Sequence, residues 1–408
     1  MARAVGRVGV VGSWLLAAGL LGASLIRPLA CTSGPDDTDD FEDETLDVLA
    51  SVGPNVVLPA LVRAGDAADL LVTEVAAWGA SFASAAGGDE VPRENARAKW
   101  HDTMAVWQEL ELMQIGPAAS GDAVAAEDLR DEIYSWPTVN PCLVDQVTVS
   151  ADYEAADFFE TAFVTAYGLD ALEVLLFAPD DENGCPPQVD INADGSWDAL
   201  GVDGVKERRA AYALVVASGI RDRIQELETA WDPAGEDFSG ALAAPGSATS
   251  PYESSSEGLN AVLDALFYLE TMTKDRKVGR PLGLTDDCVG TECLLEIESP
   301  FAGASHEWIV VNLAAFRTLF DGGDGAGMDD LLVAHGQGAA ADGMHAALDV
   351  ADAAAAAIDV PIDEAAGNDD PRLLELHAAL ADVTDLLKSD VTTLLSLDLP
   401  DEAAGDND

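Results

Sequence analysis

The stretch AYGLDALEVLLFAPDDENGCPP, residues 166–187, places two acids, Asp170 and Glu173, inside a strongly apolar run. Carboxylates three residues apart lie on one face of a helix. The same stripe continues, at spacings of three and four residues, through Phe163, Ala166 and Phe177. We therefore expect a helix over residues 153–177 whose acidic stripe faces the interior.

The rest of the chain has the same helical character. Ala-rich and Leu-rich segments repeat with a period near 3.6, and alternating β-branched runs are few. The expected helices cover residues 55–86, 94–114, 122–134, 153–177, 203–231, 256–275, 304–321, 326–358 and 369–396. Helices of this length, joined by mostly short loops, pack as antiparallel bundles, so we predict an all-α fold. A polar, Gly-rich segment at residues 188–204 suggests an N-terminal bundle at 45–190 and a C-terminal bundle at 200–400.

The composition limits the classes of protein to which this chain can belong. The chain has 408 residues, 49% of them hydrophobic, which is enough to bury a large core. It carries 20 Lys and Arg against 75 Asp and Glu. Such a surface repels nucleic acid and acidic lipid headgroups, so neither is expected as a partner. We interpret the acidity as a solvated coat, because a cation site needs carboxylates that converge.

The N-terminus is typical of an exported protein. Residues 1–30 begin with arginines, continue in a long apolar run and end in small residues before Cys31. The sequence PLAC resembles a bacterial lipobox, which predicts lipidated Cys31 as the first residue after cleavage. An uncleaved membrane anchor and a plain secretory signal are the alternatives. Residues 31–44 then read as a flexible acidic tether, and we expect no second membrane-spanning run after it.

Four further cysteines fit the same compartment. Their even number in an exported chain predicts disulfides. We prefer Cys142 with Cys185, which ties the loops flanking the helix expected at 153–177, and Cys288 with Cys293, which closes a short loop. Zinc is the alternative, although neither a CxxC spacing nor a neighbouring His supports it.

A second helix repeats the placement of an acid on a packed face. In RENARAKWHDTMAVWQELELMQIGP, the residues Trp100, Met104, Trp107 and Glu111 follow one another at helical spacing. Glu111 therefore continues an aromatic face. An unpaired buried carboxylate is costly, so it must be protonated, pair with a cation or bind a metal.

Three interpretations of these acids remain open. They form an ion pair with Arg97, Lys274, Lys277 or Arg280; they hold a metal, as carboxylates on facing helices of bundles do; or they act as an acid–base pair with divergent pKa values. Residue spacing alone does not separate them.

The order of these segments resembles the imelysin family. Its signature G-x-H-x-x-E matches Gly168 to Glu173, with Asp170 in place of the His. A second segment, W-x3-R-x2-Y-x3-E, matches Trp100 to Glu111, with Met104 in place of the Arg and Trp107 in place of the Tyr. Further similarity lies in LRDEIYSWPTVNP, LETMTKDRKVGRPLG and ESPFAGASHEWIVVNLAAFRTLFDG, and together these segments cover most of residues 45–396.

The resemblance implies an all-α fold of two helical bundles with a site near their interface. It also implies an exported bacterial protein, often encoded with iron-uptake functions and historically classed as a metallopeptidase. Carried onto this chain, the site comprises Glu111, Asp170 and Glu173, with Trp100 and Trp107 as pocket walls. This all-oxygen set suits a hard cation such as iron, calcium or magnesium better than zinc.

We therefore expect an exported, lipid-anchored protein of the periplasm or outer membrane. It would bind a cation as an accessory of metal uptake, with metal-uptake proteins as partners; simple secretion is the alternative location. The first alternative function is a structural or partner-binding lipoprotein whose site has decayed. The second is a metallopeptidase, which the sequence disfavours because His306 begins HEWIV and lacks the second His of HExxH. No catalytic residue is assigned.

Overall fold

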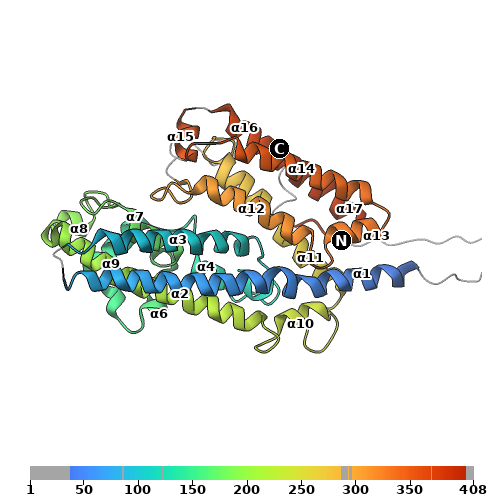
Figure 1. Ribbon diagram of the computed structural model, residues 1–408, viewed down its shortest axis with the longest axis horizontal. Helices are drawn as coiled ribbons and strands as arrows, with labels where there is room; N and C mark the ends of the chain where they lie inside the picture. Colours follow the sequence, from blue (N-terminus) through green and yellow to red (C-terminus); the bar gives the residue numbers. More distant parts are fainter. Residues whose placement is uncertain are drawn as a thin grey trace, which may run out of the picture. The chain divides into compact units, whose positions relative to one another are not determined.

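Helices account for the regular secondary structure of the protein. The computed structural model describes residues 37–84, 87–121, 123–285, 293, 296–368 and 370–400, with side chains from residue 41 onward. No strand occurs within these ranges, so the all-α prediction is confirmed (Figure 1).

The first ten α-helices are α1 (Asp37–Ser51), α2 (Leu58–Ser81), α3 (Glu90–Glu111), α4 (Leu129–Ile133), α5 (Pro141–Ser150), α6 (Phe158–Thr161), α7 (Leu169–Phe177), α8 (Asp190–Ala193), α9 (Ser196–Trp231) and α10 (Phe238–Ala243). The others are α11 (Ser255–Leu266), α12 (Ser305–Phe320), α13 (Met328–Ala334), α14 (Gly338–Ala356), α15 (Ile362–Gly367), α16 (Pro371–Leu386) and α17 (Thr392–Leu394). The π-helical and 3₁₀ segments are η1 (Val52–Val57), η2 (Gly116–Ala118), η3 (Asp152–Glu154), η4 (Val164–Ala166), η5 (Leu269–Gly279) and η7 (Leu387–Val391).

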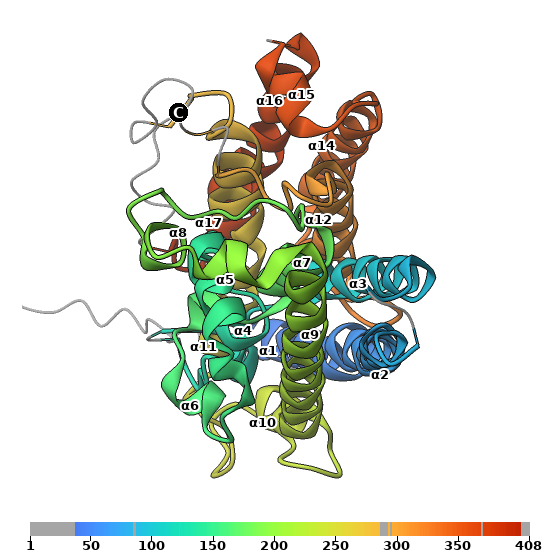
Figure 2. The same cartoon turned by 90° about the vertical axis from the view of Figure 1, so that its left-hand side faces the viewer.

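The helices form two groups that share one hydrophobic core. In the first group α2 packs against α3 and α9, while α4, α5 and α7 pack on α9 (Figures 1 and 2). In the second group α14 packs against α12 and α16, and η5 packs on α12 and α16. The groups meet where α3 packs on α12, and the buried apolar side chains form a continuous cluster through both.

The chain from Thr38 onward forms one compact unit. Helices α9 and α10 fall in the range predicted for the C-terminal bundle, yet they pack against α2 and η1. The residue ranges of two separate domains therefore stay a prediction.

Helix α1 changes the interpretation of the acidic N-terminal segment. Residues 37–44 are helical, so the prediction of a flexible tether is wrong for this part of residues 31–44. The ring of Phe41 stacks on that of His335 at 3.8 Å between centroids, and Val48 and Leu49 are buried. These apolar contacts anchor the helix. The expected export signal at 1–30 and Cys31 lie outside the described residues.

A long apolar helix follows directly. By length and composition, the helical stretch Phe41–Ser81 could cross a bilayer, which corrects the expectation that no such run follows the signal. Its most apolar window is 56% buried inside the protein. The buried face includes Ala60, Leu71 and Trp78, which belong to the common core. The stretch therefore serves as a core helix of the folded unit.

The helix expected at 153–177 is broken into short pieces. Only α7 is a regular helix of more than one turn, and η3, α6 and η4 precede it. Gly168 precedes α7 with φ +100°, where a Cβ would lie 3.0 Å from the Ile133 carbonyl oxygen. Phe163 is 75% exposed, so the predicted buried stripe is wrong for its first turn. Close tertiary contact overrides local helix propensity here.

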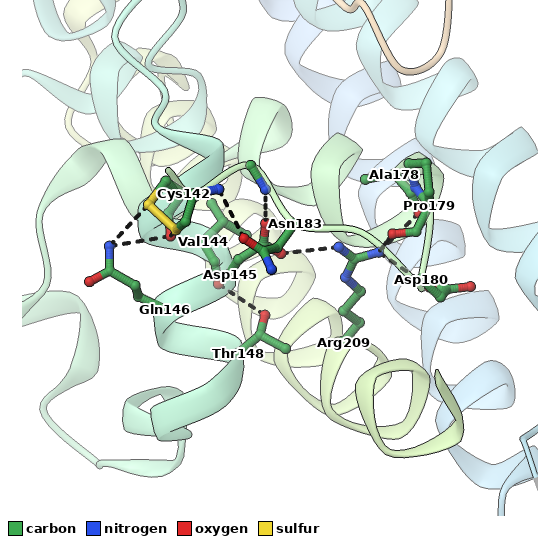
Figure 3. A network of polar contacts seen from close by, with 12 residues as sticks. Cys142, Val144, Asp145, Gln146, Thr148, Ala178, Pro179, Asp180, Asn183 and Arg209 are labelled. Carbon is green, nitrogen blue, oxygen red and sulfur yellow. Dashed lines mark hydrogen bonds and ion pairs between the residues drawn. A yellow bond between two sulfur atoms is a disulfide. The ribbon is translucent and has the colours of Figure 1, made fainter. Parts of the chain in front are cut away.

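A disulfide joins α5 to the loop that follows α7. Cys142 and Cys185 are bonded, as predicted (Figure 3). Cys288, half of the second expected pair, lies outside the described residues. Between the joined segments, Asp145 accepts hydrogen bonds from the Gly184 N–H at 2.8 Å and from Arg209 at 3.0 Å. The side chains of Asp145 and Arg209 are both buried, so an internal ion pair lies next to the disulfide.

Basic side chains hold the C-terminal end of α7. Arg209 donates to the carbonyls of Ala178 and Pro179, each at 2.9 Å (Figure 3). The Nε atoms of Arg93 and Arg97 both donate to the Leu176 carbonyl, at 3.0 and 2.8 Å. Positive charge at a helix C-terminus is favourable. Helix α7, which carries the signature acids, is thus fixed by three arginines.

Candidate functional site

The two acids of α7 are buried and accept hydrogen bonds from neutral donors. Asp170 Oδ2 accepts from the Ser135 hydroxyl at 2.8 Å, and its Oδ1 accepts from the Ala171 N–H at 2.9 Å. Glu173 Oε1 accepts from the backbone N–H groups of Phe301 and Ala302, both at 2.8 Å. Each of the two residues is 3% exposed. The predicted inward orientation of this pair is confirmed.

The environment of these two acids favours their protonated forms. Burial raises the pKa of Asp170 to about 7, although the hydrogen bond from Ser135 opposes this. Burial likewise raises the pKa of Glu173 to about 8, and the charges of Asp170 and Glu298 add to the rise. Among the described residues, no Lys, Arg or His nitrogen lies within 4.0 Å of either carboxyl. Near neutral pH the surroundings of the pair therefore favour retention of a proton, on Glu173 more than on Asp170.

Glu111, the third predicted ligand, has a basic partner. It is fully buried at the end of α3, and its Oε1 lies 2.6 Å from Nη2 of Arg130 on α4. An ion pair was one of the three interpretations, but Arg130 was not among the partners considered. The Glu111 carboxyl also faces the buried hydroxyl of Tyr268: burial raises the pKa of Tyr268, and the charge of Glu111 and a hydrogen bond to it raise that pKa further.

A fourth buried acid, Glu298, was missed from the sequence. Its Oε2 lies 2.9 Å from Lys277 Nζ, and its Oε1 accepts hydrogen bonds from Gln108 at 2.8 Å and Tyr134 at 2.7 Å. Lys277 also donates to Gln108 and to Asn312. Burial raises the pKa of Glu298, while the charge of Lys277 lowers it.

The four acids belong to one cluster, and three of them act on the same phenol. Burial raises the pKa of Tyr134, and the charges of Glu298, Glu111 and Asp170 raise it further in that order. We define the carboxylate cluster as these side chains and their bases: Glu111, Asp170, Glu173, Glu298, Arg130 and Lys277. It draws on α3, α4, α7, η5 and the segment before α12, where the two groups of helices meet. Acids outnumber bases four to two.

The ligand atoms of the carboxylate cluster do not form a closed metal site. In the part of the chain that the structure describes, the group of three side chains with ligand atoms within 4.8 Å of one another comprises Asp321, Asp329 and His345. The ligand atoms of Glu111, Asp170 and Glu173 do not converge to that extent. Hydrogen bonds and the Arg130 ion pair hold these acids apart.

The two tryptophans predicted as pocket walls are both buried. Trp100 donates its Nε1–H to the Leu169 carbonyl at 2.7 Å, directly before Asp170. It thereby holds the first turn of α7 against α3. The Trp107 Nε1–H is buried and has no described hydrogen-bond partner. Whether the two rings line a binding pocket stays a prediction.

A cleft of about 860 Å³ reaches the outer side of the cluster. Arg130 and Tyr268 line it, together with Pro137 and Phe267. A smaller cavity of about 110 Å³ adjoins Gly168, at the start of the signature segment. Glu111 does not line this cleft, but its partners Arg130 and Tyr268 do.

Most of the site residues that were not predicted lie in sequence segments that had been noticed, but the sequence did not assign these residues a role. Arg130, Tyr134 and Ser135 lie in LRDEIYSWPTVNP, and Glu298 opens ESPFAG. Lys277, in LETMTKDRKVGRPLG, is one of the predicted ion-pair partners, and the acid that it pairs with is Glu298. These segments carried the family resemblance. Their polar residues converge on the acids only through the tertiary fold.

The fold and the buried carboxylate cluster define an all-α protein of imelysin-like architecture. A family model described as Imelysin (Peptidase_M75) matches residues 64–394, and the chain belongs to this family. No curated protein sequence matches the chain significantly.

Two solved structures share the fold. A protein named as an iron-regulated protein A precursor, from Parabacteroides distasonis ATCC 8503, superposes with a TM-score of 0.67 at 18% identity, covering 87% of this chain and 95% of its own. An imelysin-like protein from Psychrobacter arcticum 273-4 superposes with a TM-score of 0.66 at 20% identity, covering 88% of this chain and 98% of its own.

Proposed function

We propose that this imelysin-family protein binds a hard cation at Asp170 and Glu173 and serves as an exported accessory of metal uptake. The observation that carries the proposal is the burial of two carboxyls one helical turn apart, without a basic side chain within 4.0 Å among the described residues. Carboxylate oxygens favour iron, calcium or magnesium over zinc.

The charge balance of the cluster supports a cation. Arg130 and Lys277 neutralise Glu111 and Glu298, which leaves Asp170 and Glu173 to be neutralised by protons or by a bound ion. Glu111 then shapes the field around the site, while Asp170 and Glu173 supply the ligands. Iron is the cation that we favour, because the structural neighbour from Parabacteroides is named as an iron-regulated protein.

Cation binding at this pair competes with protons. Both pKa values lie near or above neutrality, so a cation must displace protons as it binds. Affinity should therefore rise with pH, and binding near pH 7 should release protons to the buffer. A loosely held surface ion would release none, because exposed carboxylates are already ionised there.

A second candidate function is a structural or partner-binding protein with a degenerate site. The pairing of Glu111 with Arg130 favours it, because one predicted ligand is already satisfied. This candidate requires that the hydrogen bonds from Ser135 and from the backbone at 301–302 are the permanent partners of the acids.

Equilibrium binding of Fe³⁺ and Ca²⁺ separates the two functions. The test compares the unmodified chain with the double variant Asp170→Asn/Glu173→Gln, which keeps the shape of both side chains. The variant Asp181→Asn/Glu182→Gln is the matched control, because it makes the same amide substitutions at exposed residues that have no partner in the described part of the chain. We expect the control to bind like the unmodified chain and the site variant to lose high-affinity binding and proton release. Equal affinity in all three proteins would refute the cation site.

Export and anchoring form a separate part of the proposal. We infer that Cys31 is the lipidated residue and that the folded unit is held at the cell envelope, near metal-uptake proteins. Metabolic labelling with a fatty acid tests this inference. The Cys31→Ser variant should lose both the label and its association with the membrane fraction; a labelled variant would refute the assignment.

A further inference from the structure

Three side chains near the C-terminal helices converge away from the carboxylate cluster. Asp321 directly follows α12, Asp329 lies in the first turn of α13, and His345 lies in the middle of α14. Each can direct one ligand atom so that the three atoms lie within 4.8 Å of one another. All three side chains are partly exposed, so solvent reaches the group.

The turn between α12 and α13 is built to bring the two aspartates together. Gly322 has φ +71°, and a Cβ there would lie 2.0 Å from the Ala326 carbonyl oxygen. At Gly327 a Cβ would lie 2.5 Å from Asp329 Oδ1 and 2.4 Å from the Phe320 carbonyl oxygen. Only glycine allows the Asp329 carboxylate to fold back against the end of α12.

The hydrogen bonding of the group leaves one ligand atom unused. His345 Nε2 lies 2.8 Å from Asp321 Oδ1, and the imidazole packs edge-on against the ring of Phe320. Asp329 Oδ1 is buried and accepts no hydrogen bond of good geometry among the described residues, and the nearest donor to the Asp329 carboxyl is the backbone N–H of Asp330. A buried acceptor without a donor is unfavourable, and a cation placed among the three ligand atoms would satisfy it.

We propose that Asp321, Asp329 and His345 form a second metal site, which takes a divalent transition ion such as Zn²⁺, Fe²⁺ or Co²⁺. One imidazole nitrogen with two carboxylate oxygens suits these ions better than calcium or magnesium, which prefer oxygen alone. Two carboxylates and a neutral imidazole carry the charge that balances a divalent ion. Water or another small ligand completes the coordination, because three protein ligands leave a position open.

The site links three helices that are otherwise joined by short turns. A bound ion connects the end of α12, the start of α13 and the middle of α14 in one coordination sphere. Binding to the folded state alone stabilises that state, so the unfolding temperature should rise with metal concentration. The proposal does not depend on the function assigned to Asp170 and Glu173.

The test titrates Zn²⁺ into the full chain carrying Asp170→Asn/Glu173→Gln, so that the carboxylate cluster does not contribute. In this background, Asp329→Asn and His345→Gln remove single ligands. Asp342→Asn is the control, because it changes charge on the same helix α14 at an exposed residue outside the group. Loss of a neighbour that merely orients a ligand weakens metal sites by about 10–100-fold, so loss of a ligand should weaken Zn²⁺ binding by about 100-fold or more.

We expect the background protein and its Asp342→Asn form to bind a single Zn²⁺ tightly. Indistinguishable affinities for Asp329→Asn, His345→Gln and Asp342→Asn would overturn the proposal and assign the binding to diffuse surface charge. If a ligand variant folds poorly, the imidazole NMR signals of the background protein test the proposed site without that variant. Zn²⁺ must shift the signal of His345, and an unshifted signal overturns the site.

Discussion

The stability of the protein should depend on pH through Asp170 and Glu173. Burial raises the pKa of Asp170 from 3.8 to about 7 and that of Glu173 from 4.5 to about 8. The folded state therefore binds more protons than the unfolded state between these values. Stability from this source is fully present below the unfolded pKa values and is lost as the pH rises through the folded ones.

The expected loss can be worked from these shifts. Each pH unit between the unfolded and folded pKa values costs about 1.4 kcal/mol per group. Between about pH 5 and about pH 8, ionisation of Asp170 alone should lower the free energy of unfolding by about 3 kcal/mol. The two acids together should lose less than the sum expected for two independent groups, because the charge of Asp170 is one reason why the pKa of Glu173 is raised.

The assay is urea unfolding, followed by tryptophan fluorescence and circular dichroism, at fixed ionic strength and with a chelator present. The unmodified chain and Asp181→Asn/Glu182→Gln should lose stability in parallel as the pH rises. The variant Asp170→Asn/Glu173→Gln should lose roughly 3–5 kcal/mol less over the same range. Parallel pH profiles for all three proteins would refute the inference that these acids are protonated in the folded state.

Three further predictions concern stability, measured by urea unfolding. Arg130→Met should cost about 3–5 kcal/mol because it leaves the buried Glu111 carboxylate unpaired, and adding Glu111→Gln should recover much of this; an equally unstable double variant would contradict the ion pair. Gly168→Ala should cost about 1–3 kcal/mol because of its positive φ and close contacts, whereas Gly343→Ala, in open space on α14, should be neutral or stabilising; similar losses at both would be inconsistent with this account. Replacing both cysteines of the described disulfide with serine should cost about 4 kcal/mol, given their separation of 43 residues, and an unchanged midpoint under oxidising conditions would exclude that contribution.

Local patterns predicted those features that depend on neighbouring residues. The helix expected at 304–321 is α12, Ser305–Phe320, because apolar residues there recur with helical period and no glycine or proline interrupts them. The number of cysteines favoured disulfides, and the pair Cys142–Cys185 is confirmed. The inward placement of Asp170 and Glu173 followed from the apolar residues that surround them.

Features that depend on tertiary contacts could not be predicted from local sequence patterns. The segment before α7 contains good helix formers, yet it is broken because the backbone at Gly168 must pass close to the Ile133 carbonyl. Arg130 pairs with Glu111 from α4, which covers only the end of the helix expected at 122–134, and helical spacing does not indicate which acid Arg130 contacts. Glu298 lies outside any helix, so no periodicity marked it as buried. Its partners on α3 and η5 are close only in the folded chain.

The burial of basic side chains affects the electrostatic interaction between separate copies of the protein. Arg93, Arg209 and Lys277 are at most 2% exposed, and each is paired with an acid inside the protein. The chain has only 20 basic residues, so few remain outside to form contacts with the acids of a neighbouring molecule. Two approaching copies therefore repel each other within a screening length of about 10 Å at 0.1 M salt. Crowded molecules should stay dispersed at neutral pH and associate when acid or concentrated salt removes that repulsion.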